Sequence, residues 1–316
     1  MSTQTNHILI GSRGSELARW QSDWIADQLR LVHPGVTTEV TMIKTTGDKI
    51  LDAPLSKIGD KGLFTKELDA ALLDGRIDLA VHSLKDVPTR LEPGLTLGAV
   101  CKREDVRDVF ITHPNKRYRS FRDVPHGGII ATGSLRRRCQ LLALRPDLKV
   151  AEIRGNISTR IAKLEKSEWD GMLMARAGLM RLGWGSMITE ILEPTTMLPA
   201  VGQGALAVEV REQDARMRDL VYRVNDLPTE QATASERTLL GELEGGCQIP
   251  IGAYGRIQGG VLKLDAMVGS LDGRRTVRGR TEGSPDQAES LGRSLANELL
   301  SSGAKEILEE IRRQKS

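Results

Sequence analysis

The chain has 316 residues, of which 39% are hydrophobic and 28% charged, so it is long enough for two or three globular domains. Its net charge is only +3 and aromatic residues make up 3%, which argues against an RNA-binding protein, because such proteins need a basic surface and aromatic rings that stack on bases. Any function that uses positive charge must therefore concentrate it locally.

The first predicted elements are a buried strand at residues 7–11, a turn at 12–15 and a helix that runs to about Leu31, with Ser15 as its N-cap. A strand, a small polar turn and a helix N-terminus present free backbone N–H groups and the positive end of the helix dipole, which together bind anions. Arg13 in the turn would add a guanidinium. A helix cap beside a surface arginine explains the same pattern, so both interpretations stay open here.

Residues 45–62 follow a predicted strand at 36–43 and contain glycines, a proline and lysines, but neither helical nor strand periodicity. Loops of this length in a compact domain are usually functional lids or disordered segments. We favour a lid loop, which would carry Lys57 and Lys61.

A helix at 64–73 and a strand at 77–81 are predicted next. The strand leads directly into Lys85 and Asp86, and ligands of α/β sheets bind beside such strand ends. A surface ion pair is the alternative. We expect His82 to be a hydrogen-bonded structural residue, because no second metal ligand lies at a usable spacing.

After a strand at 98–101, a charged segment indicates a crossover into a second lobe. There the first motif is repeated: a strand at 128–131, a turn with Thr132 and Ser134, and a helix that begins at 135 and ends near 146. Its first turn contains Arg136 and Arg137, whose charges oppose the helix dipole, so an anionic partner would stabilise them. The two motifs suggest two anion-binding helix ends that face one cleft. We expect Cys101 and Cys139 to be core residues.

A strand at 150–153 leads to Arg154 and to a helix with Arg160 in its second turn. A strand at 171–175 leads to Arg176 and Arg181. Residues 198–206 contain proline and glycine between apolar residues, which indicates a return crossover to the first lobe, followed by a strand at 205–210.

The last part of the chain predicts a small α+β domain. A helix at 231–243 is followed by a loop in which two glycines precede Cys247. This cysteine could be a small apolar residue packed at a turn, or a thiolate that acts as a nucleophile or attachment point. A hairpin around Gly259 and Gly260, a strand at 276–279 and a helix at 286–300 follow.

The three cysteines are far apart and form no CxxC pair, so neither a disulfide framework nor a metal site is expected. The first residues are polar, and no apolar run approaches the ~18 residues of a spanning helix. We therefore expect a cytoplasmic protein that does not bind a membrane.

Several stretches together resemble the porphobilinogen deaminase (hydroxymethylbilane synthase) family over essentially the whole chain. They are SRGSELA (12–18), GDKILDAPLSKIGDKGLFTKEL (47–68), AVHSLKDVPT (80–89), ATGSLRRRCQL (131–141), RGNISTRIAKL (154–164), AGLMRLG (177–183), LPAVGQGAL (198–206) and LEGGCQIPIGAY (243–254). No single stretch would be specific, but the set is.

The resemblance implies an α/β fold of two lobes, built like those of periplasmic binding proteins, plus a small C-terminal α+β domain. The first lobe would comprise 1–103 and 205–223, with the lid at 45–62, and the second 104–204. Residues 224–316 would form the domain that carries the cofactor cysteine. A dipyrromethane cofactor would be joined to Cys247 by a thioether. The enzyme, expected to be a monomer, would add four porphobilinogen units in turn, lose ammonia each time, and release hydroxymethylbilane by hydrolysis.

The resemblance also implies residue roles. Asp86 would stabilise positive charge on the pyrrole ring and shuttle protons. Cofactor carboxylates would be held by Lys85, Thr132, Ser134, Arg136 and Arg137. Substrate and the leaving amine would be handled by Arg13, Ser15, Arg154 and Arg160, with Arg181 as a further substrate-binding candidate.

Two positions depart from the family pattern. Gly133 stands where a serine or alanine is common, and Arg176 stands where a small or apolar residue is expected. Arg176 would either contact a carboxylate or point to solvent. An anion-binding module without catalysis is the main rival function for the whole chain.

Overall fold

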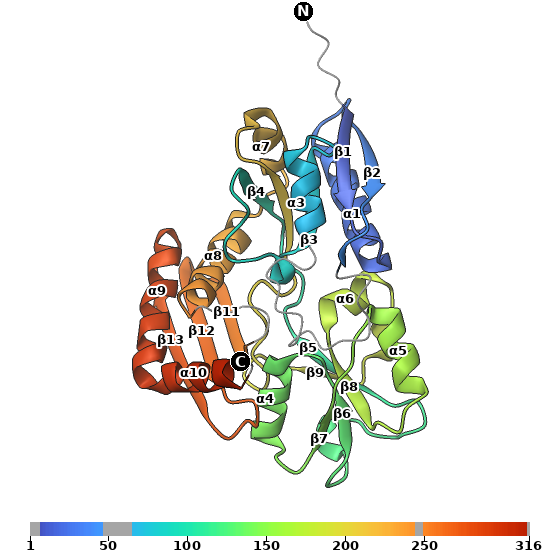
Figure 1. Cartoon of the computed structure of the whole chain (residues 1–316), viewed down its shortest axis with the longest axis vertical. Helices are drawn as coiled ribbons and strands as arrows, with labels where there is room; N and C mark the ends of the chain where they lie inside the picture. Colours follow the sequence, from blue (N-terminus) through green and yellow to red (C-terminus); the bar gives the residue numbers. More distant parts are fainter. Residues whose placement is uncertain (1–6, 47–64, 244–248, 315–316) are drawn as a thin grey trace, which may run out of the picture. The chain divides into compact units, whose positions relative to one another are not determined.

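The computed structural model describes residues 7–46, 65–243 and 249–314 (Figure 1). The chain divides into two compact units. Among the described residues, the first unit contains 7–46, 65–103 and 205–230, and the second contains 104–204, 231–243 and 249–314. Each unit has its own sheets and its own hydrophobic cores.

The first unit is built on a five-stranded sheet with the strand order β2-β1-β3-β10-β4. β1, β2 and β3 are parallel, whereas β10 is antiparallel to both of its neighbours. The strands are β1 (His7–Ser12), β2 (Thr37–Met42), β3 (Leu79–Ser83), β4 (Leu95–Val100) and β10 (Leu206–Arg211). The helices are α1 (Glu16–Val32), α3 (Lys66–Leu73) and α7 (Ala215–Tyr222), and a short 3-10 turn, η2 (Leu84–Asp86), follows β3.

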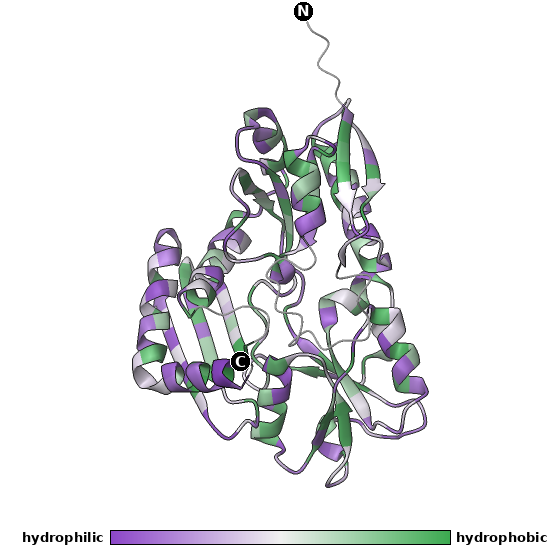
Figure 2. Cartoon of the chain, viewed as in Figure 1, coloured by the Kyte–Doolittle hydropathy of each residue, from purple (hydrophilic) through white to green (hydrophobic). Residues whose placement is uncertain are grey.

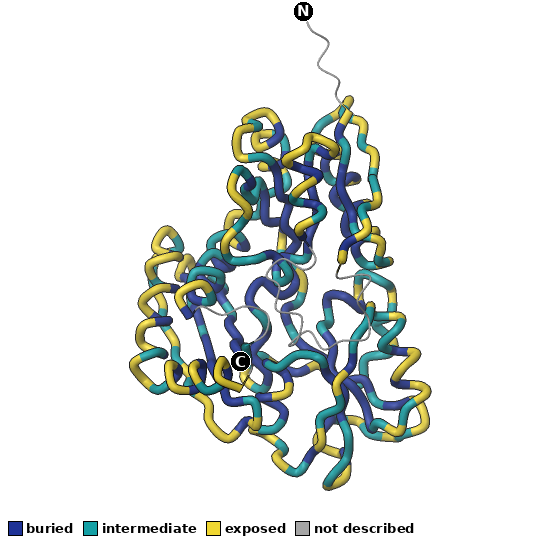
Figure 3. Tube along the Cα trace, viewed as in Figure 1, coloured by how far each residue is buried: buried dark blue, intermediate teal, exposed yellow. Residues whose placement is uncertain are grey.

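Both faces of this sheet are covered by helices, so its central strands are apolar on both sides. Ile8, Ile10 and Val208 pack with Ile25 of α1 on one face. Residues of α3 such as Leu68 pack with Ala80 on the other. This is the expected α/β pattern, and Figures 2 and 3 show the hydrophobic and buried residues concentrated along the strands.

The second unit repeats this topology in a sheet ordered β7-β6-β8-β5-β9, again with an antiparallel fourth strand. The strands are β5 (Asp108–Thr112), β6 (Ile129–Ala131), β7 (Lys149–Ala151), β8 (Gly171–Ala175) and β9 (Glu190–Leu192). The helices are α4 (Leu135–Leu144), α5 (Ile157–Glu165) and α6 (Arg176–Arg181), with 3-10 turns η3 (Phe121–Asp123) and η4 (Gly185–Met187).

The second unit also contains a three-stranded antiparallel sheet, β11-β12-β13, covered on one face by helices. Its elements are β11 (Ile251–Gln258), β12 (Val261–Gly269), β13 (Thr276–Gly283), η5 (Pro285–Gln287), α9 (Ala288–Leu299), η6 (Leu300–Ala304) and α10 (Lys305–Arg313). α8 (Leu227–Glu242) runs into this part of the chain. Gly259 and Gly260 have positive φ values of 59° and 77°, as a two-residue hairpin turn requires. The expected fold class, two α/β lobes with a small α+β domain, is confirmed.

Some elements were not predicted from the sequence or begin elsewhere. The sequence analysis missed four elements: β5, β9, α6 and α7. β5 begins with a buried aspartate directly after a charged segment, so its sequence lacks the apolar start that is typical of a buried strand. β3 begins two residues later than predicted, because the N–H of Ile77 bonds to the carbonyl of Ala71 in the turn after α3. Among the described residues, no helix is long and apolar enough to cross a membrane.

Candidate functional site

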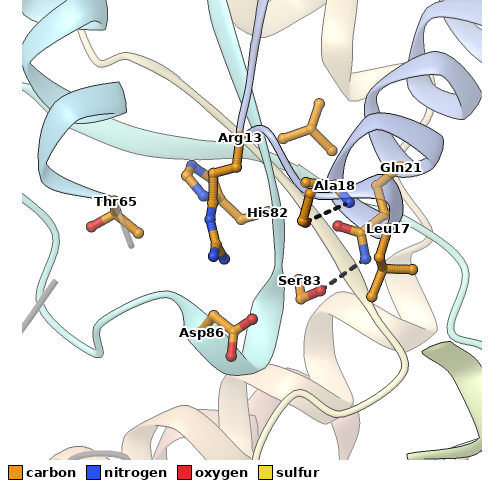
Figure 4. Close-up of a pocket in the computed structure, with 10 residues that line it drawn as sticks. Arg13, Leu17, Ala18, Gln21, Thr65, His82, Ser83 and Asp86 are labelled. Carbon is orange, nitrogen blue, oxygen red and sulfur yellow. Dashed lines mark hydrogen bonds between the residues drawn. The ribbon is translucent and has the colours of Figure 1, made fainter. Parts of the chain in front are cut away.

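A small pocket in the first unit lies where two strands end and a helix begins (Figure 4). β1 and β3 are adjacent and parallel, so the segments that leave their carboxyl ends lie side by side. The residues that line the pocket include Arg13, Ser15, Gln21, Thr65, His82 and Asp86. The structure therefore brings together three residues that the sequence predicted for the site: Arg13, Ser15 and Asp86.

The start of α1 forms one wall of the pocket. Ser15 Oγ accepts a hydrogen bond of 3.2 Å from the N–H of Ala18, which confirms the predicted N-cap. One turn further, Gln21 Nε2 donates to Ser83 Oγ at 2.8 Å and ties the helix to the end of β3. The positive end of α1 is thus fixed at the pocket, next to Arg13.

The turn η2 presents Asp86 to the pocket. Buried Leu84 anchors this turn, and its N–H donates to the carbonyl of Ala205 at 3.0 Å. Lys85 and Asp86 are half-buried, and Figure 4 shows the guanidinium of Arg13 extended toward the Asp86 carboxylate. A cation and an anion in one pocket suit a ligand that carries both charges.

In the second unit, the start of α4 is arranged similarly, but its charges are balanced internally. Ser134 Oγ caps the helix by accepting from the N–H of Arg137, and Thr132 Oγ1 accepts from the N–H of Ser134 at 3.2 Å. Arg136 Nη1 lies 2.6 Å from Asp108 Oδ2, and Arg137 Nη2 lies 2.8 Å from Asp108 Oδ1. All three of these charged side chains are buried.

The Asp108 carboxylate is the anion that offsets the two arginines at this helix start. Burial alone would raise the pKa of Asp108, but the charges of Arg136 and Arg137 hold it well below its usual range. Each arginine also bonds a carbonyl: Arg136 Nη1 donates to Leu198 at 2.7 Å and Arg137 Nη1 to Leu173 at 3.2 Å. Sequence reasoning missed Asp108, because it interpreted the charged segment just before it only as a crossover into a second lobe and did not consider Asp108.

Arg154 and Arg160 lie on either side of the start of α5. Asn156 Oδ1 caps this helix by accepting from the N–H of Thr159 at 2.8 Å. Arg160 Nε donates to the carbonyl of Gly155 at 2.7 Å. Arg154 Nη1 is buried and has no hydrogen-bond partner within the described ranges. This nitrogen is therefore suited to receive an acceptor oxygen from a ligand.

The two departures from the family pattern have structural explanations. Arg176 Nη1 lies 3.1 Å from Asp105 Oδ2, so this arginine is held in an internal ion pair. A Cβ atom at Gly133 would lie 2.4 Å from the carbonyl oxygen of Ile153, so the backbone there approaches too closely for a side chain without a shift. Arg181 Nη2 donates to the carbonyl of Gly204 at 2.7 Å.

Other expectations can be compared directly with the described residues. His82 is confirmed as a buried, hydrogen-bonded residue, with Nε2 3.0 Å from Glu209 Oε2. Cys101 and Cys139 are confirmed as core residues, and burial raises the pKa of Cys139 to about 11. Cys247, Lys57 and Lys61 lie outside the described residues.

Comparisons with known proteins agree along most of the chain. Residues 8–219 match the family described as "Porphobilinogen deaminase, dipyromethane cofactor binding domain", and residues 231–301 match "Porphobilinogen deaminase, C-terminal domain". A porphobilinogen deaminase from Carboxydothermus hydrogenoformans is 49% identical over 306 residues, which is 97% of both chains. One from Chlorobium phaeobacteroides is 50% identical over 310 residues, 97% of this chain and 98% of the relative.

The comparison with solved structures found matches of lower similarity. The methionine-binding protein MetQ has a TM-score of 0.42 and 14% identity over 70% of this chain and 90% of that chain. A double mutant of the VFT2 domain of Bordetella pertussis BvgS has a TM-score of 0.43 and 14% identity over 69% of this chain and 86% of that chain.

The fold and the family matches define an α/β enzyme with a dipyrromethane-binding domain. The chain belongs to the porphobilinogen deaminase family. It is therefore a transferase of tetrapyrrole biosynthesis that polymerises porphobilinogen to hydroxymethylbilane. A binding module without catalysis is thereby set aside.

Proposed function

We propose that porphobilinogen units are joined in the pocket that contains Arg13 and Asp86. The observation that carries this proposal is the presence of a guanidinium, a helix N-terminus and a carboxylate in one pocket. Porphobilinogen has two carboxylates and an aminomethyl group that is cationic at neutral pH. Arg13, with Ser15 and the first turn of α1, suits a carboxylate, and Asp86 suits the cationic side of the molecule.

Asp86 is the proposed catalytic group. Loss of ammonia leaves positive charge on the pyrrole ring, and a fixed carboxylate stabilises this charge most when water is excluded. It can also hold and move a proton at its carboxylate oxygens. Four units would be added in this way, and hydrolysis would release the linear product.

The dipyrromethane would be joined to Cys247 by a thioether, and when bound it supplies the end to which units are added. The residues described here fit a group with several carboxylates. Arg136 Nε and Arg154 Nη1 are buried and make no hydrogen bond with the residues that the structure describes, so both can accept a carboxylate oxygen as partner. The proposed cofactor-holding residues are Lys85, Asp86, Thr132, Ser134, Arg136 and Arg137.

The remaining site residues are proposed for the substrate side. Arg154 and Arg160 would bind carboxylates of the incoming unit and assist departure of the amine, and Arg181 would add a further guanidinium. Lys57 and Lys61 on the lid, the cytoplasmic location, the monomeric state and the lack of a nucleic-acid partner stay predictions from the sequence.

Intact mass tests the covalent attachment. We expect the denatured protein to exceed the mass of the bare chain by two linked pyrrole units. Cys247→Ser should show the bare mass, because a hydroxyl does not form the thioether. Cys101→Ser is the matched control and should keep the excess mass, since Cys101 lies in the core.

Two outcomes would contradict the attachment. Excess mass that persists in Cys247→Ser would place the group elsewhere. A bare wild-type mass that stays bare after incubation with porphobilinogen would mean that no such group is attached at all.

A further inference from the structure

Three titratable side chains form a connected group behind the pocket. His82 of β3 and Glu209 of β10 are 5% and 2% exposed, and His82 Nε2 lies 3.0 Å from Glu209 Oε2. Asp69 of α3 lies close enough to Glu209 for the charge of Glu209 to raise its pKa, and its Oδ2 accepts a hydrogen bond of 3.0 Å from Thr65 Oγ1. Thr65 and His82 both line the pocket, so this group connects directly to it.

The strand register explains why these residues meet. β10 pairs His82 with Ala207 and Ala80 with Glu209, so His82 and Glu209 lie on the same face of the sheet. The residues opposite them, Ala80 and Ala207, are small and leave space for polar side chains. α3 packs on this face and places Asp69 near Glu209.

Asp69 and Glu209 are neighbouring carboxyls in a buried setting, and charging both of them costs free energy because like charges repel. Burial, followed by the charge of Glu209, raises the pKa of Asp69 to about 6, against the opposing effects of Thr65 and His82. Below that pH, Asp69 is mostly protonated. In the tautomer of His82 whose Nε2–H donates to a carboxylate oxygen of Glu209, the lone pair is on Nδ1.

Nε2 of His82 is engaged by Glu209, so Nδ1 is the ring nitrogen available to a ligand in the pocket. It makes no hydrogen bond with any residue in the ranges 7–46, 65–243 and 249–314. The charged residues that line the pocket with it are Arg13 from the turn after β1 and Asp86 from η2 (Figure 4). The other charged neighbours are Glu209, which contacts Nε2, and Asp69. The neighbouring carboxylate of α3, Glu67, instead accepts from the backbone N–H of Thr46 at 2.7 Å.

We infer that His82 accepts and returns a proton through Nδ1 during porphobilinogen joining, and that Glu209 and Asp69 are positioning residues that fix its tautomer. This inference rests on the proposed function of the pocket. None of these three residues belongs to the set that the sequence assigned to the site, and Asp69 and Glu209 reach the reaction only through His82.

The proton balance of the reaction needs such a group. When two units are joined, a C–C bond forms, the C–N bond of the incoming unit breaks, and its electron pair leaves with nitrogen as ammonia. A C–H bond of the receiving ring also breaks and leaves its electrons in the ring. The released proton ends on ammonia as ammonium, so one side chain that takes it up and passes it on completes the balance.

His82→Gln tests the proton transfer. We expect kcat to fall by roughly 10²-fold, the lower end for loss of a general acid–base group, with a much smaller change in KM. The matched control is His33→Gln. His33 is in the same unit, and its Nε2 hydrogen-bonds to the carbonyl of Leu220 at 2.8 Å, outside the pocket. This control should keep the wild-type kcat.

Asp69→Asn tests the positioning role with a nearly isosteric side chain. An amide donates to Glu209 at every pH, so it imitates the protonated acid. We expect the wild-type pH profile of kcat/KM to bend near pH 6, where the pKa of Asp69 lies, and the Asp69→Asn profile to lack this bend. An independent readout is ¹⁵N NMR of the five histidine rings, in which His82 should show the tautomer with its proton on Nε2.

Each outcome decides the inference. A His82→Gln variant with wild-type kcat overturns it, as do coinciding pH profiles for Asp69→Asn and the wild type, or an NMR spectrum that places the ring proton of His82 on Nδ1. If His82→Gln does not fold, the Asp69→Asn profile and the NMR tautomer decide alone. Full turnover by Asp86→Asn would instead overturn the proposed function of the pocket, so the two failures are distinguishable.

Discussion

Asp86→Asn is expected to lower the turnover of porphobilinogen by at least about 10²-fold, because it removes the proposed catalytic charge while nearly preserving the side-chain shape. Leu84, which anchors the turn, is unchanged, so the local structure should persist. The measurement is steady-state consumption of porphobilinogen at pH 7, together with intact mass to verify that the cofactor is still attached. We expect the mass excess to be retained and the fall to be in kcat.

Asp74→Asn is the control for this experiment. Asp74 is in the same unit, but its side chain is 63% exposed and is paired with exposed Arg76 at 3.4 Å. Its rate should stay within about twofold of the wild type, since exposed ion pairs contribute little. If Asp86→Asn turned over porphobilinogen at the rate of this control, the carboxylate would have no catalytic role.

The part of the site in the first unit could be predicted because its residues follow a local rule. Arg13 and Asp86 come directly after strands of high apolar content, and the carboxyl ends of parallel strands meet at one edge of a sheet. Ser15 precedes a helical pattern and was predicted as the cap, which the structure confirms. Each of these patterns depends only on residues that are neighbours in the sequence, so it can be recognised without knowing the fold.

The partners of these residues could not be predicted, because they are distant in sequence. Glu209 lies 127 residues from His82, and Asp108 lies 28 residues from Arg136. The sheet register brings Glu209 to His82, and the packing of α4 against β5 brings Arg136 to Asp108. Neither arrangement is visible in a single sequence. For the same reason, the arginines at the start of α4 indicated an anion without indicating that Asp108 supplies it.

Arg176 illustrates the same limit for a single side chain. The sequence left open whether it contacts a carboxylate or points to solvent. The structure pairs it with Asp105, which also accepts from Arg107 Nη2 at 2.6 Å. Asp105 lies in the charged segment after the predicted strand at 98–101, which the sequence indicated only as a crossover into the second lobe.

Asp108→Asn is expected to destabilise the second unit strongly, by about 3–5 kcal/mol in free energy of unfolding, because it leaves two buried guanidiniums without their shared counter-charge. Arg136 and Arg137 are only 4% and 5% exposed, so water cannot replace the lost carboxylate. The two units need not unfold together, so the probe must be confined to the second unit. The measurement is urea unfolding followed by tryptophan fluorescence in a background where Trp20 and Trp24 of the first unit are replaced by Phe, which leaves Trp169 and Trp184 of the second unit as the probes. Asp272→Asn is the control, since its 57% exposed side chain pairs with exposed Arg274 at 3.7 Å, and its cost should stay within about 0.5 kcal/mol.

The pH dependence gives this prediction a second, independent check. The pKa of Asp108 is lower in the folded state than in the unfolded state. Its ionised form therefore stabilises the folded protein above the unfolded-state pKa of about 3.9, and this stabilisation is lost as the pH falls toward the folded-state pKa. The stability difference between wild type and Asp108→Asn should therefore be constant from pH 5 to 7 and should shrink progressively below about pH 4. A difference that stayed constant down to pH 2 would mean that the variant is destabilised by altered packing, and that the charge of Asp108 is not what holds the start of α4 in place.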